Sequence, residues 1–438
     1  MQVRHLLAYG LGVAATIGFL AVPAAAQASS ALWVSSATTV SGNGTSCTQP
    51  GFNTIQSAIN AAPANGVIDV CAGTYTEQLQ ISQSVTIDGL GNVEVQLPSA
   101  PVDSTTPCDS AKGTAAFQPD QDGIAICGGS SQTVTLSNIS VDAAWATSVC
   151  DDSLYGILVG GGATLNFDNS SVVAAGAYPL NGCQGGIGIE AGMSWTKPIE
   201  VGHLVMTDSW ISGYQKNGVV ADGFRSTASI SDSAVIGAGS TMTIAQNGVQ
   251  VSDSAQLSMT HTTISGNECS DNAAPCGANG LEDTQSAGLL FFGAAKGNFV
   301  TDCTFTYNDM GLYYLANPNG GAIKRPQVTL TGDQFVDNRY EGAVLDEGSA
   351  NITKSGFSRG NVGIEVLQYG GSNGQKFGSF SEASHDTFAN VKDSVDVLSD
   401  KAAGDEAGTF TITFSNIYAA KVLDNSKNLK IIHNHDTK

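Results

Sequence analysis

From Thr227 to Asn267 the chain reads TASISDSAVIGAGSTMTIAQNGVQVSDSAQLSMTHTTISGN. Short stretches of alternating apolar and polar residues are divided there by Gly, Asn, Asp and Ser. An earlier copy of the phrase, HLVMTDSWI, runs from His203 to Ile211. Alternation with a period of two is typical of strands with one buried face, and the dividing residues are turn formers. The segment therefore predicts an all-β repeat of short strands and turns.

Each copy of the repeat is marked by an apolar residue that stands two places after a small polar residue. These apolar residues recur along the chain at spacings of 22 to 41 residues. Stacked coils with loops at their corners tolerate such variation. We expect the polar members to form one column whose short side chains hydrogen-bond turn backbone, so that Cys303 fills a serine-like place. The apolar members are Ile139, Val172, Ile211, Val235, Ile264, Phe305, Phe335, Phe357, Phe388 and Ile417, and the polar members are Ser137, Ser170, Ser209, Ser233, Thr262, Cys303, Asp333, Ser355, Asp386 and Ser415.

A second family of strands begins with glycine, and its alternate residues should fill the coil interior. Asn267, Asn308 and Asn338, each three places after an apolar anchor, predict an asparagine ladder at another corner, where Asn tolerates left-handed geometry. Roughly a dozen coils at about 4.8 Å each would form one elongated domain. The glycine starts are Gly123, Gly156, Gly186, Gly218, Gly248, Gly288, Gly311, Gly342 and Gly363.

A helix is predicted ahead of the repeat. Between Thr54 and Ala62 apolar residues recur at helical spacing, Asn53 or Thr54 can cap the start, and Pro63 ends the segment. Short strands are expected around this helix. Their ranges are 31–34, 67–70, 78–81 and 85–89.

The segments Thr54–Ile59, Gly73–Glu77 and Val85–Gly89 resemble the opening of pectin-lyase-like right-handed parallel β-helices, a superfamily that includes pectin methylesterases. The resemblance covers about 40 residues and implies that the helix caps the first coil, where an open sheet edge would invite pairing. The Gln-Ala-Val-Ala, Asp-Phe-Ile-Phe-Gly and Leu-Gly-Arg-Pro-Trp motifs that carry methylesterase catalysis have no counterpart here. The resemblance therefore implies the fold and argues against that activity.

The first residues have the pattern of a secretory signal peptide. Arg4 and His5 precede an apolar run, Leu6–Val22, and Ala24–Ala26 offers a cleavage site. The alternative is an uncleaved membrane anchor, while no later stretch is apolar enough to span a bilayer. The expected organisation is a signal peptide at 1–26, an N-terminal strand and capping helix at 27–66, and a single right-handed parallel β-helix, all-β, at 67–438.

The formal net charge of −21 argues against nucleic acid and anionic membrane as partners. It would also repel an acidic glycan, unless Ca²⁺ or a local basic patch bridged the two. No phosphate loop, dinucleotide fingerprint or Gly-x-Ser-x-Gly motif is present, so no cofactor is expected.

Nine cysteines follow the predicted signal, and export makes disulfides the expected state. Cys269 and Cys276 bracket an apparent insertion and are expected to pair. The pairs Cys47–Cys71, Cys108–Cys127 and Cys150–Cys183 are plausible, although spacing leaves the connectivity open. No cysteine spacing suggests zinc, and no metal ligand is predicted.

Carboxylates that could cleave a glycosidic bond fall in three successive predicted coils between residues 100 and 200. Asp122, the pair Asp151 and Asp152, and Gly185–Gly188 follow one another in an order similar to the catalytic motifs of polygalacturonases. Two or three carboxylates on one face could supply the required acid and base. The histidine and the Arg-Ile-Lys of that family are missing, and acidic residues also serve as turn formers.

Basic residues near carboxylates would be needed for a lyase. Lys324–Pro326 and Arg339–Glu341, near Asp346 and Glu347, are the candidates, and loop ion pairs are the structural alternative.

Aromatic residues could stack on sugar rings. Trp145 and Trp195 are expected in loops, and Trp210 beside the serine column with its ring outward. The candidate carbohydrate-binding residues are Trp145, Tyr155, Trp195 and Trp210.

Two functional hypotheses follow from these patterns. The first is a secreted, noncatalytic or degenerate β-helix protein that binds extracellular or cell-wall polysaccharide. The second is a polysaccharide-degrading enzyme, a hydrolase more than a lyase, that uses Asp122, Asp151 and Asp152. In both, the partner is a polysaccharide, nucleic acid is not a partner, and no membrane span remains after signal cleavage.

Overall fold

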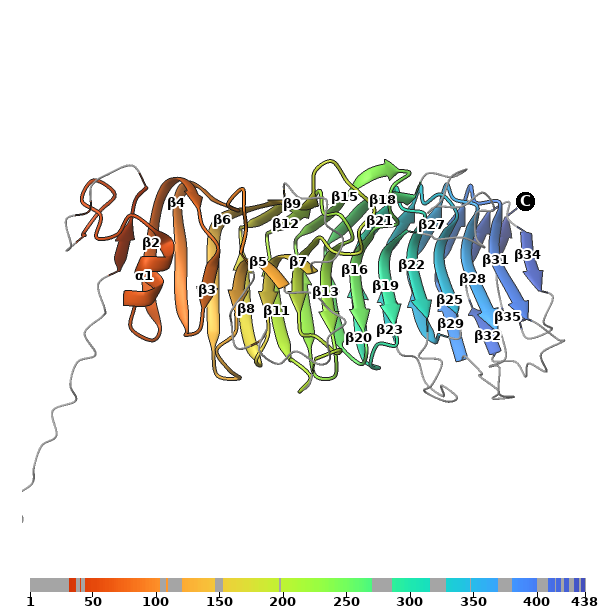
Figure 1. Ribbon diagram of the computed structural model, residues 1–438. Helices are drawn as coiled ribbons and strands as arrows, with labels where there is room; N and C mark the ends of the chain where they lie inside the picture. Colours follow the sequence, from red (N-terminus) through yellow and green to blue (C-terminus); the bar gives the residue numbers. More distant parts are fainter. Residues whose placement is uncertain are drawn as a thin grey trace, which may run out of the picture. The chain divides into compact units, whose positions relative to one another are not determined.

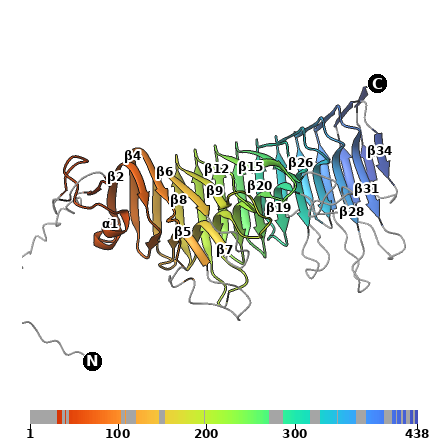
Figure 2. The same ribbon diagram turned by 45° about the horizontal axis from the view of Figure 1, so that its top comes forward.

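Strands of successive coils lie side by side in the computed structural model, from β2 (Gly66–Thr76) to β34 (Lys421–Asp424), and a second view shows the same stacking (Figures 1 and 2). The described residues lie in the unit Ala31–Lys438. They are 31–36, 40, 44–102, 108, 120–145, 153–196, 198–269, 286–315, 328–346, 348–368, 380–399, 409–413, 415–418, 421–424, 429–432 and 435–437.

The short helix α1 (Ile55–Ala61) directly precedes β2 in the chain. The Thr54 hydroxyl caps its start by accepting the Ser57 N–H, and the Glu77 carboxylate accepts the N–H groups of Ile55 and Gln56 at 2.8 and 3.0 Å. A carboxylate at a helix N-terminus satisfies backbone donors and complements the helix dipole. The predicted helix is confirmed, and Glu77 ties it to the first coil.

A sheet of twelve parallel strands forms one face of the coils. It follows the glycine-started family that the sequence predicts. Its strands are β3 (Leu79–Ile81), β5 (Asp120–Ile126), β7 (Ser153–Val159), β10 (Ile187–Ala191), β13 (Asn217–Asp222), β16 (Asn247–Ser252), β19 (Ala287–Phe292), β22 (Met310–Leu315), β25 (Glu341–Asp346), β28 (Val362–Gln368), β31 (Asp393–Ser399) and β34.

A sheet of twenty-four parallel strands bends around a corner and forms two arms. The long strands β2, β4 (Val85–Gln96) and β6 (Thr133–Trp145) run through both arms, and β1 (Leu32–Val34) pairs with β2. The first arm continues with β8 (Ala163–Asp168), β11 (Gly202–Thr207), β14 (Thr227–Ser231), β17 (Gln256–Thr260), β20 (Asn298–Thr301), β23 (Val328–Thr331), β26 (Ala350–Thr353), β29 (Phe380–Ser384), β32 (Thr409–Thr413) and β35 (Leu429–Ile432). The second arm continues with β9 (Ser171–Ala177), β12 (Trp210–Ser212), β15 (Ala234–Thr241), β18 (Thr263–Cys269), β21 (Thr304–Thr306), β24 (Gln334–Val336), β27 (Gly356–Ser358), β30 (Thr387–Ala389), β33 (Asn416–Tyr418) and β36 (His435–Thr437).

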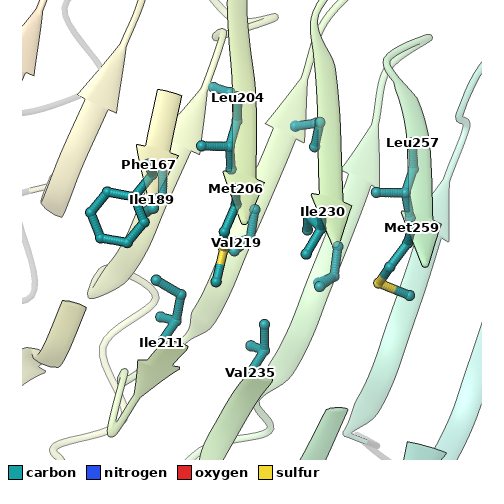
Figure 3. Packing of buried hydrophobic residues seen from close by; sticks show 14 of the residues in the cluster. Phe167, Ile189, Leu204, Met206, Ile211, Val219, Ile230, Val235, Leu257 and Met259 are labelled. Carbon is teal, nitrogen blue, oxygen red and sulfur yellow. The ribbon is translucent and has the colours of Figure 1, made fainter. Parts of the chain in front are cut away.

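The core fills the space between the sheets. Side chains such as Met206 of the first arm, Ile211 of the second and Val219 of the twelve-stranded sheet are buried together (Figure 3). Farther along, four phenylalanine rings stack with centroids 4.8, 4.8 and 5.1 Å apart, which is the strand spacing. They are the predicted anchors Phe305, Phe335, Phe357 and Phe388.

The serine column is confirmed from Ser170 onward. The Ser209 hydroxyl accepts the Ser170 N–H at 3.0 Å and donates to the Thr207 carbonyl at 2.7 Å. Cys303 is a free, buried thiol in the same place, and its Sγ lies 3.4 Å from the Thr301 carbonyl. Burial raises the pKa of this thiol to about 12, so it stays protonated and structural.

The first members of both columns are wrong by two residues. Val141, not Ile139, is paired with Val172, and Ile139 donates its N–H to the Ser170 hydroxyl. Ser137 is still in the first arm, paired with Asp168, because the corner of β6 lies at Asn138. The pattern of a serine two places before an isoleucine therefore occurs here two residues too early in the strand.

The asparagine ladder is confirmed. The Asn267 amide donates to the Asn308 side-chain oxygen at 2.8 Å, and the Asn308 amide donates to that of Asn338 at 3.1 Å. The left-handed backbone lies one residue earlier than predicted, for example at Tyr307 (φ 53°) and Asp337 (φ 54°). The asparagine side chains are thereby free to turn into the buried ladder.

The predicted glycines align in one column of the twelve-stranded sheet, with one correction. Gly188, not Gly186, belongs to the column, because Ile187 pairs with Tyr155 and Ile189 with Ile157. Successive coils approach closely at this column: a Cβ on Gly156 would lie 2.6 Å from the Gly188 carbonyl oxygen. The column therefore requires glycine for close approach of backbone.

Two of the plausible disulfides are confirmed, Cys47–Cys71 and Cys108–Cys127. Cys183 and Cys269 are also disulfide-bonded, and their expected partners, Cys150 and Cys276, lie outside the described residues. The predicted signal peptide at 1–26 lies outside them too. Among the helices that the structure describes, none has the length and apolar character needed to cross a membrane.

Candidate functional site

The three predicted catalytic carboxylates cannot be placed together. Asp122 lies in β5, in register with Tyr155, and is only 3% exposed. Asp151 and Asp152 lie outside the described residues. Their convergence with Asp122 stays a prediction.

The predicted aromatic residues separate into buried and exposed ones. Trp145 is 1% exposed at the end of β6 and packs in the core, so its predicted loop position is wrong. Tyr155 is also buried, in an apolar cluster with Cys108 and Cys127 against which Trp195 packs. Trp210 is 45% exposed, with its ring on the outer face of β12 as predicted. Strand alternation explains both outcomes, because it turns Trp145 inward and Trp210 outward.

A hollow of about 300 Å³ opens beside the Trp210 ring. Trp210 is paired with Ser171 on one side and Ala234 on the other, and Ser171 is paired with Ser140, so only short side chains flank the indole in its own row. We call this feature the Trp210 hollow. Its lining consists of Gly91, Asn92, Val93, Asn138, Ile139, Ser140, Asn169, Ser170, Ser171 and Trp210.

Neutral polar groups supply the hydrogen bonds of the hollow. The Asn169 amide donates to the Asn138 side-chain oxygen at 2.5 Å, and the Asn138 amide donates to the Asp88 carboxylate at 2.7 Å. Both asparagines have left-handed backbone at the corner of their coils. Ser171 donates to Ser140 at 3.0 Å. These hydrogen bonds fix the orientation of both side-chain amides, and the series begins at Asn169, whose side-chain oxygen faces away from Asn138.

Carboxylates surround this neutral lining. Asp88 accepts the last hydrogen bond in the series that runs from Asn169 through Asn138. Glu94 is paired with Ser140 in the neighbouring strand. Asp208 is the corner residue of the coil that follows Asn169. Among the described residues that line the hollow, none carries a charge. A ligand there meets hydroxyl, amide and indole groups inside a negative rim.

A second group of side chains lies on the outer face of the twelve-stranded sheet. We call Asp309, Glu341, Asp346, Glu365 and Asp396 the acidic cluster. Glu341 is 1% exposed, and its Oε2 has no hydrogen-bond partner among the described residues. Burial, then the negative charges of Glu365 and Asp309, raises the pKa of Glu341 to about 9. Burial, then the charges of Asp396 and Asp346, raises the pKa of Glu365 to about 7.

Strand register brings Glu341 and Glu365 together. Glu341 is paired with Val362, and Val344 with Glu365, which is the relation that Asn217 has to Gln250 four coils earlier. The Asn217 amide reaches the Gln250 oxygen at 3.2 Å. Side chains at these two places can therefore approach each other across one coil spacing, and the charge of Glu365 contributes to the raised pKa of Glu341.

Polar groups surround the pair. The Asp309 carboxylate accepts the N–H groups of Cys269 and Ser286 at 2.8 and 3.1 Å, and Arg339 Nη1 lies 3.9 Å from its Oδ1. Burial is the main reason that the pKa of Asp309 rises to about 6. Tyr313 donates to Asp346 at 2.8 Å.

Part of the acidic cluster is predicted from the sequence. Arg339, Glu341 and Asp346 were candidates for a lyase, whereas Lys324, Arg325 and Glu347 lie outside the described residues. Glu365 and Asp309 were missed. A usable signal existed, since Glu365 stands two places after the strand glycine Gly363 and thus points outward. Within the described residues, no group of three His, Cys, Asp or Glu side chains has the arrangement of a metal site.

Comparisons with known proteins agree with this fold. A family model described as the right-handed β-helix region matches residues 185–376. The periplasmic alginate epimerase AlgG has a similar structure, with 11% identity, a TM-score of 0.56, and coverage of 89% of this chain and 84% of that one. The A-module of mannuronan C-5 epimerase AlgE6 from Azotobacter vinelandii has 12% identity, a TM-score of 0.54, and coverage of 88% and 94%. No curated protein matches the sequence.

The chain has the fold of a right-handed parallel β-helix. At 11–12% identity the two epimerase structures establish the fold, and their activities are not transferred with it.

Proposed function

We propose that this chain is a secreted protein that binds polysaccharide, and that the Trp210 hollow is its binding site. The observation that carries the proposal is an exposed indole beside a hollow lined by amides and hydroxyls. The disulfides support an oxidising, extracytoplasmic location. The names of the similar structures refer to alginate and mannuronan, which are polysaccharides, and this adds support for the ligand class.

The chemistry of the hollow suits a sugar. A sugar ring has an apolar C–H face and a rim of hydroxyl groups, so it can rest on an indole and still be hydrogen-bonded at its edge. Ligand sites in general combine apolar and aromatic lining with a few polar groups that fix orientation. Trp210 would supply the platform, and Asn138 and Asn169 the oriented polar groups.

We expect Trp210→Ala to weaken polysaccharide binding at least tenfold, which corresponds to about 1.4 kcal/mol of binding free energy. The loss follows from removing the apolar platform while the asparagines stay in place. Affinity electrophoresis and calorimetry over a polysaccharide panel would measure it. Phe299→Ala is the matched control, because Phe299 is an exposed aromatic residue on the other arm. Equal affinity in wild type and Trp210→Ala, or equal losses in both variants, would contradict this site.

A second candidate function is hydrolysis of the glycosidic bond at the acidic cluster. A carboxyl group kept neutral beside one with a lower pKa is the pattern of an acid and a base in one site. Protonated Glu341 would donate its proton to the glycosidic oxygen while ionised Glu365 adds to the anomeric carbon. Water would then add to that carbon and release Glu365, and ionised Glu341 would take the proton of the water. Both groups are buried, so the substrate would have to displace the side chains around them.

For this second function, we expect Glu341→Gln and Glu365→Gln each to lower turnover at least 100-fold in a screen for reducing sugars and unsaturated products. Asp337→Asn, on the surface beside Arg359, is the control. Turnover that instead depends on Asp151→Asn or Asp152→Asn would favour the site predicted from the sequence. Absence of turnover on every glycan would reject hydrolysis and leave binding as the function.

A further inference from the structure

We propose that the Trp210 hollow selects a neutral glycan, rich in hydroxyl groups and free of carboxylate or sulfate. This inference rests on the proposed function, namely that the hollow binds polysaccharide. It names the substrate class, and it differs from the acidic polymers that appear in the names of the similar structures.

The lining lacks the groups that bind an anionic sugar. A carboxylate removed from water needs a cation or several convergent donors, since an isolated buried charge is costly. Among the described residues that form the hollow, the side chains are those of asparagine, serine, valine, isoleucine and tryptophan, and none of these is a cation. A divalent ion as a bridge would need protein carboxylates in a metal-binding arrangement, and the described residues contain no such group.

The rim of the hollow adds repulsion. Asp88 is hydrogen-bonded directly to the lining residue Asn138, and Glu94 projects from the row that contains Ser140 and Trp210. Asp208 stands at the next corner place after Asn169. These carboxylates are one strand or one corner away from the lining, which is less than the Debye length of roughly 8–10 Å. Salt therefore does not fully screen them, and they oppose an incoming uronate. The formal net charge of −21 acts in the same direction at longer range.

The hydrogen-bonding groups that are present fit hydroxyls. Donation runs from Asn169 to Asn138 to Asp88, which leaves the Asn169 oxygen as an acceptor and the second N–H of each amide as a donor. A hydroxyl group both donates and accepts, so it satisfies either end of this array, whereas a carboxylate can only accept. The neutral ligand gains these bonds without a charge to desolvate.

The hollow also indicates how a polymer would lie. Its lining comes from four successive coils, represented by Asn92, Asn138, Asn169 and Trp210. Three coil spacings of about 4.8 Å give roughly 14 Å, so the site extends along the stacking direction. A short run of sugar rings, rather than a single ring, would occupy it.

The test compares uncharged polymers (a β-glucan and a galactomannan) with acidic ones (alginate and polygalacturonate) at fixed salt, by affinity electrophoresis and calorimetry. We expect at least tenfold tighter binding of an uncharged polymer, and loss of that binding in Trp210→Ala. Glu94→Lys should strengthen binding of the acidic polymers at least fivefold and leave neutral binding within twofold of wild type. Glu94→Gln is the uncharged control for that change.

The outcomes separate the inference from the proposed function. Tighter, Trp210-dependent binding of an acidic polymer would overturn the neutral selectivity and keep the hollow as the binding site. Binding that ignores Trp210→Ala, or no binding to any polymer, would overturn the proposed function itself.

Discussion

Gly218→Val is expected to disrupt the stacked coils, and Gly218→Ala to lower the free energy of unfolding by about 2–3 kcal/mol. A Cβ at Gly218 would lie 2.3 Å from Val235 Cγ1, 2.6 Å from the Gly248 carbonyl oxygen and 2.8 Å from Tyr214 Cε1. The contact with the carbonyl cannot be relieved by a rotamer change, because it belongs to the backbone of the next coil. Each further carbon should therefore force the two strands apart.

Urea unfolding followed by far-UV circular dichroism would measure this effect. Ser229→Val is the matched control, because Ser229 lies on the outer, exposed face of β14 and valine favours strands. We expect the control to change stability by less than about 0.5 kcal/mol. If Gly218→Val unfolded at the same urea concentration as Ser229→Val, close backbone approach would not be the reason for the glycine column.

Asp333→Asn and Asp386→Asn are expected to stabilise the protein at pH 8 by about 2–4 kcal/mol each, with little change at pH 4. Both aspartates stand in the serine column. Asp333 Oδ1 accepts the Cys303 N–H at 2.9 Å, and Asp386 Oδ1 accepts the Ser355 N–H at 2.7 Å. The Oδ2 atom of each is buried and lacks a hydrogen-bond partner among the described residues. Serine has a donating hydroxyl at this place, so a protonated carboxyl fits and an ionised one does not.

The pH dependence follows from the direction of the pKa shifts. Burial raises the pKa of both Asp333 and Asp386 to about 7, from 3.8. Below pH 3.8 both the folded and the unfolded chain hold these protons, and stability is full. Between pH 3.8 and 7 the unfolded chain releases them first, so stability falls as pH rises, and above pH 7 the loss is complete. Asparagine removes this dependence, because it keeps a donor and carries no charge.

Thermal unfolding of wild type and variants from pH 4 to 8 would measure these differences. Cys303→Ser is the control in the same column, since its exchange of thiol for hydroxyl adds no titrating group in this range. A constant difference between Asp333→Asn and wild type across that range would show that the carboxyl is ionised in the folded chain, against this account.

The sequence was a good guide to the coils, for a local reason. Strand alternation, the Phe305–Phe388 anchors and the Asn267 ladder are periodic features, and stacking aligns such features without further information. The prediction errors occur where two nearby residues both fit the motif for one position in the coil. Ser137 and Gly186 both fit their motifs, and only the pairing of whole strands decides between them and the true positions.

The candidate sites were harder to predict, because each depends on residues from several coils. The outward position of Trp210 follows from alternation, but the hollow beside it needs Asn138, Asn169 and Gly91, which lie 41 to 119 residues away in sequence. The predicted loop position of Trp145 is wrong because Trp145 is the last residue of the long strand β6. The sequence alone does not distinguish the end of such a strand from the start of the next loop. Burial of Glu341 and Glu365 could not be read from a pattern that places both on an outer face.

The most direct measurement of the central claim is a crystal structure of the protein with a bound neutral oligosaccharide chosen by the binding screen. We expect a sugar ring against the face of Trp210, with its hydroxyl groups hydrogen-bonded to Asn138 and Asn169. An oligosaccharide ordered elsewhere, such as over the acidic cluster, with the Trp210 hollow holding only water, would contradict it.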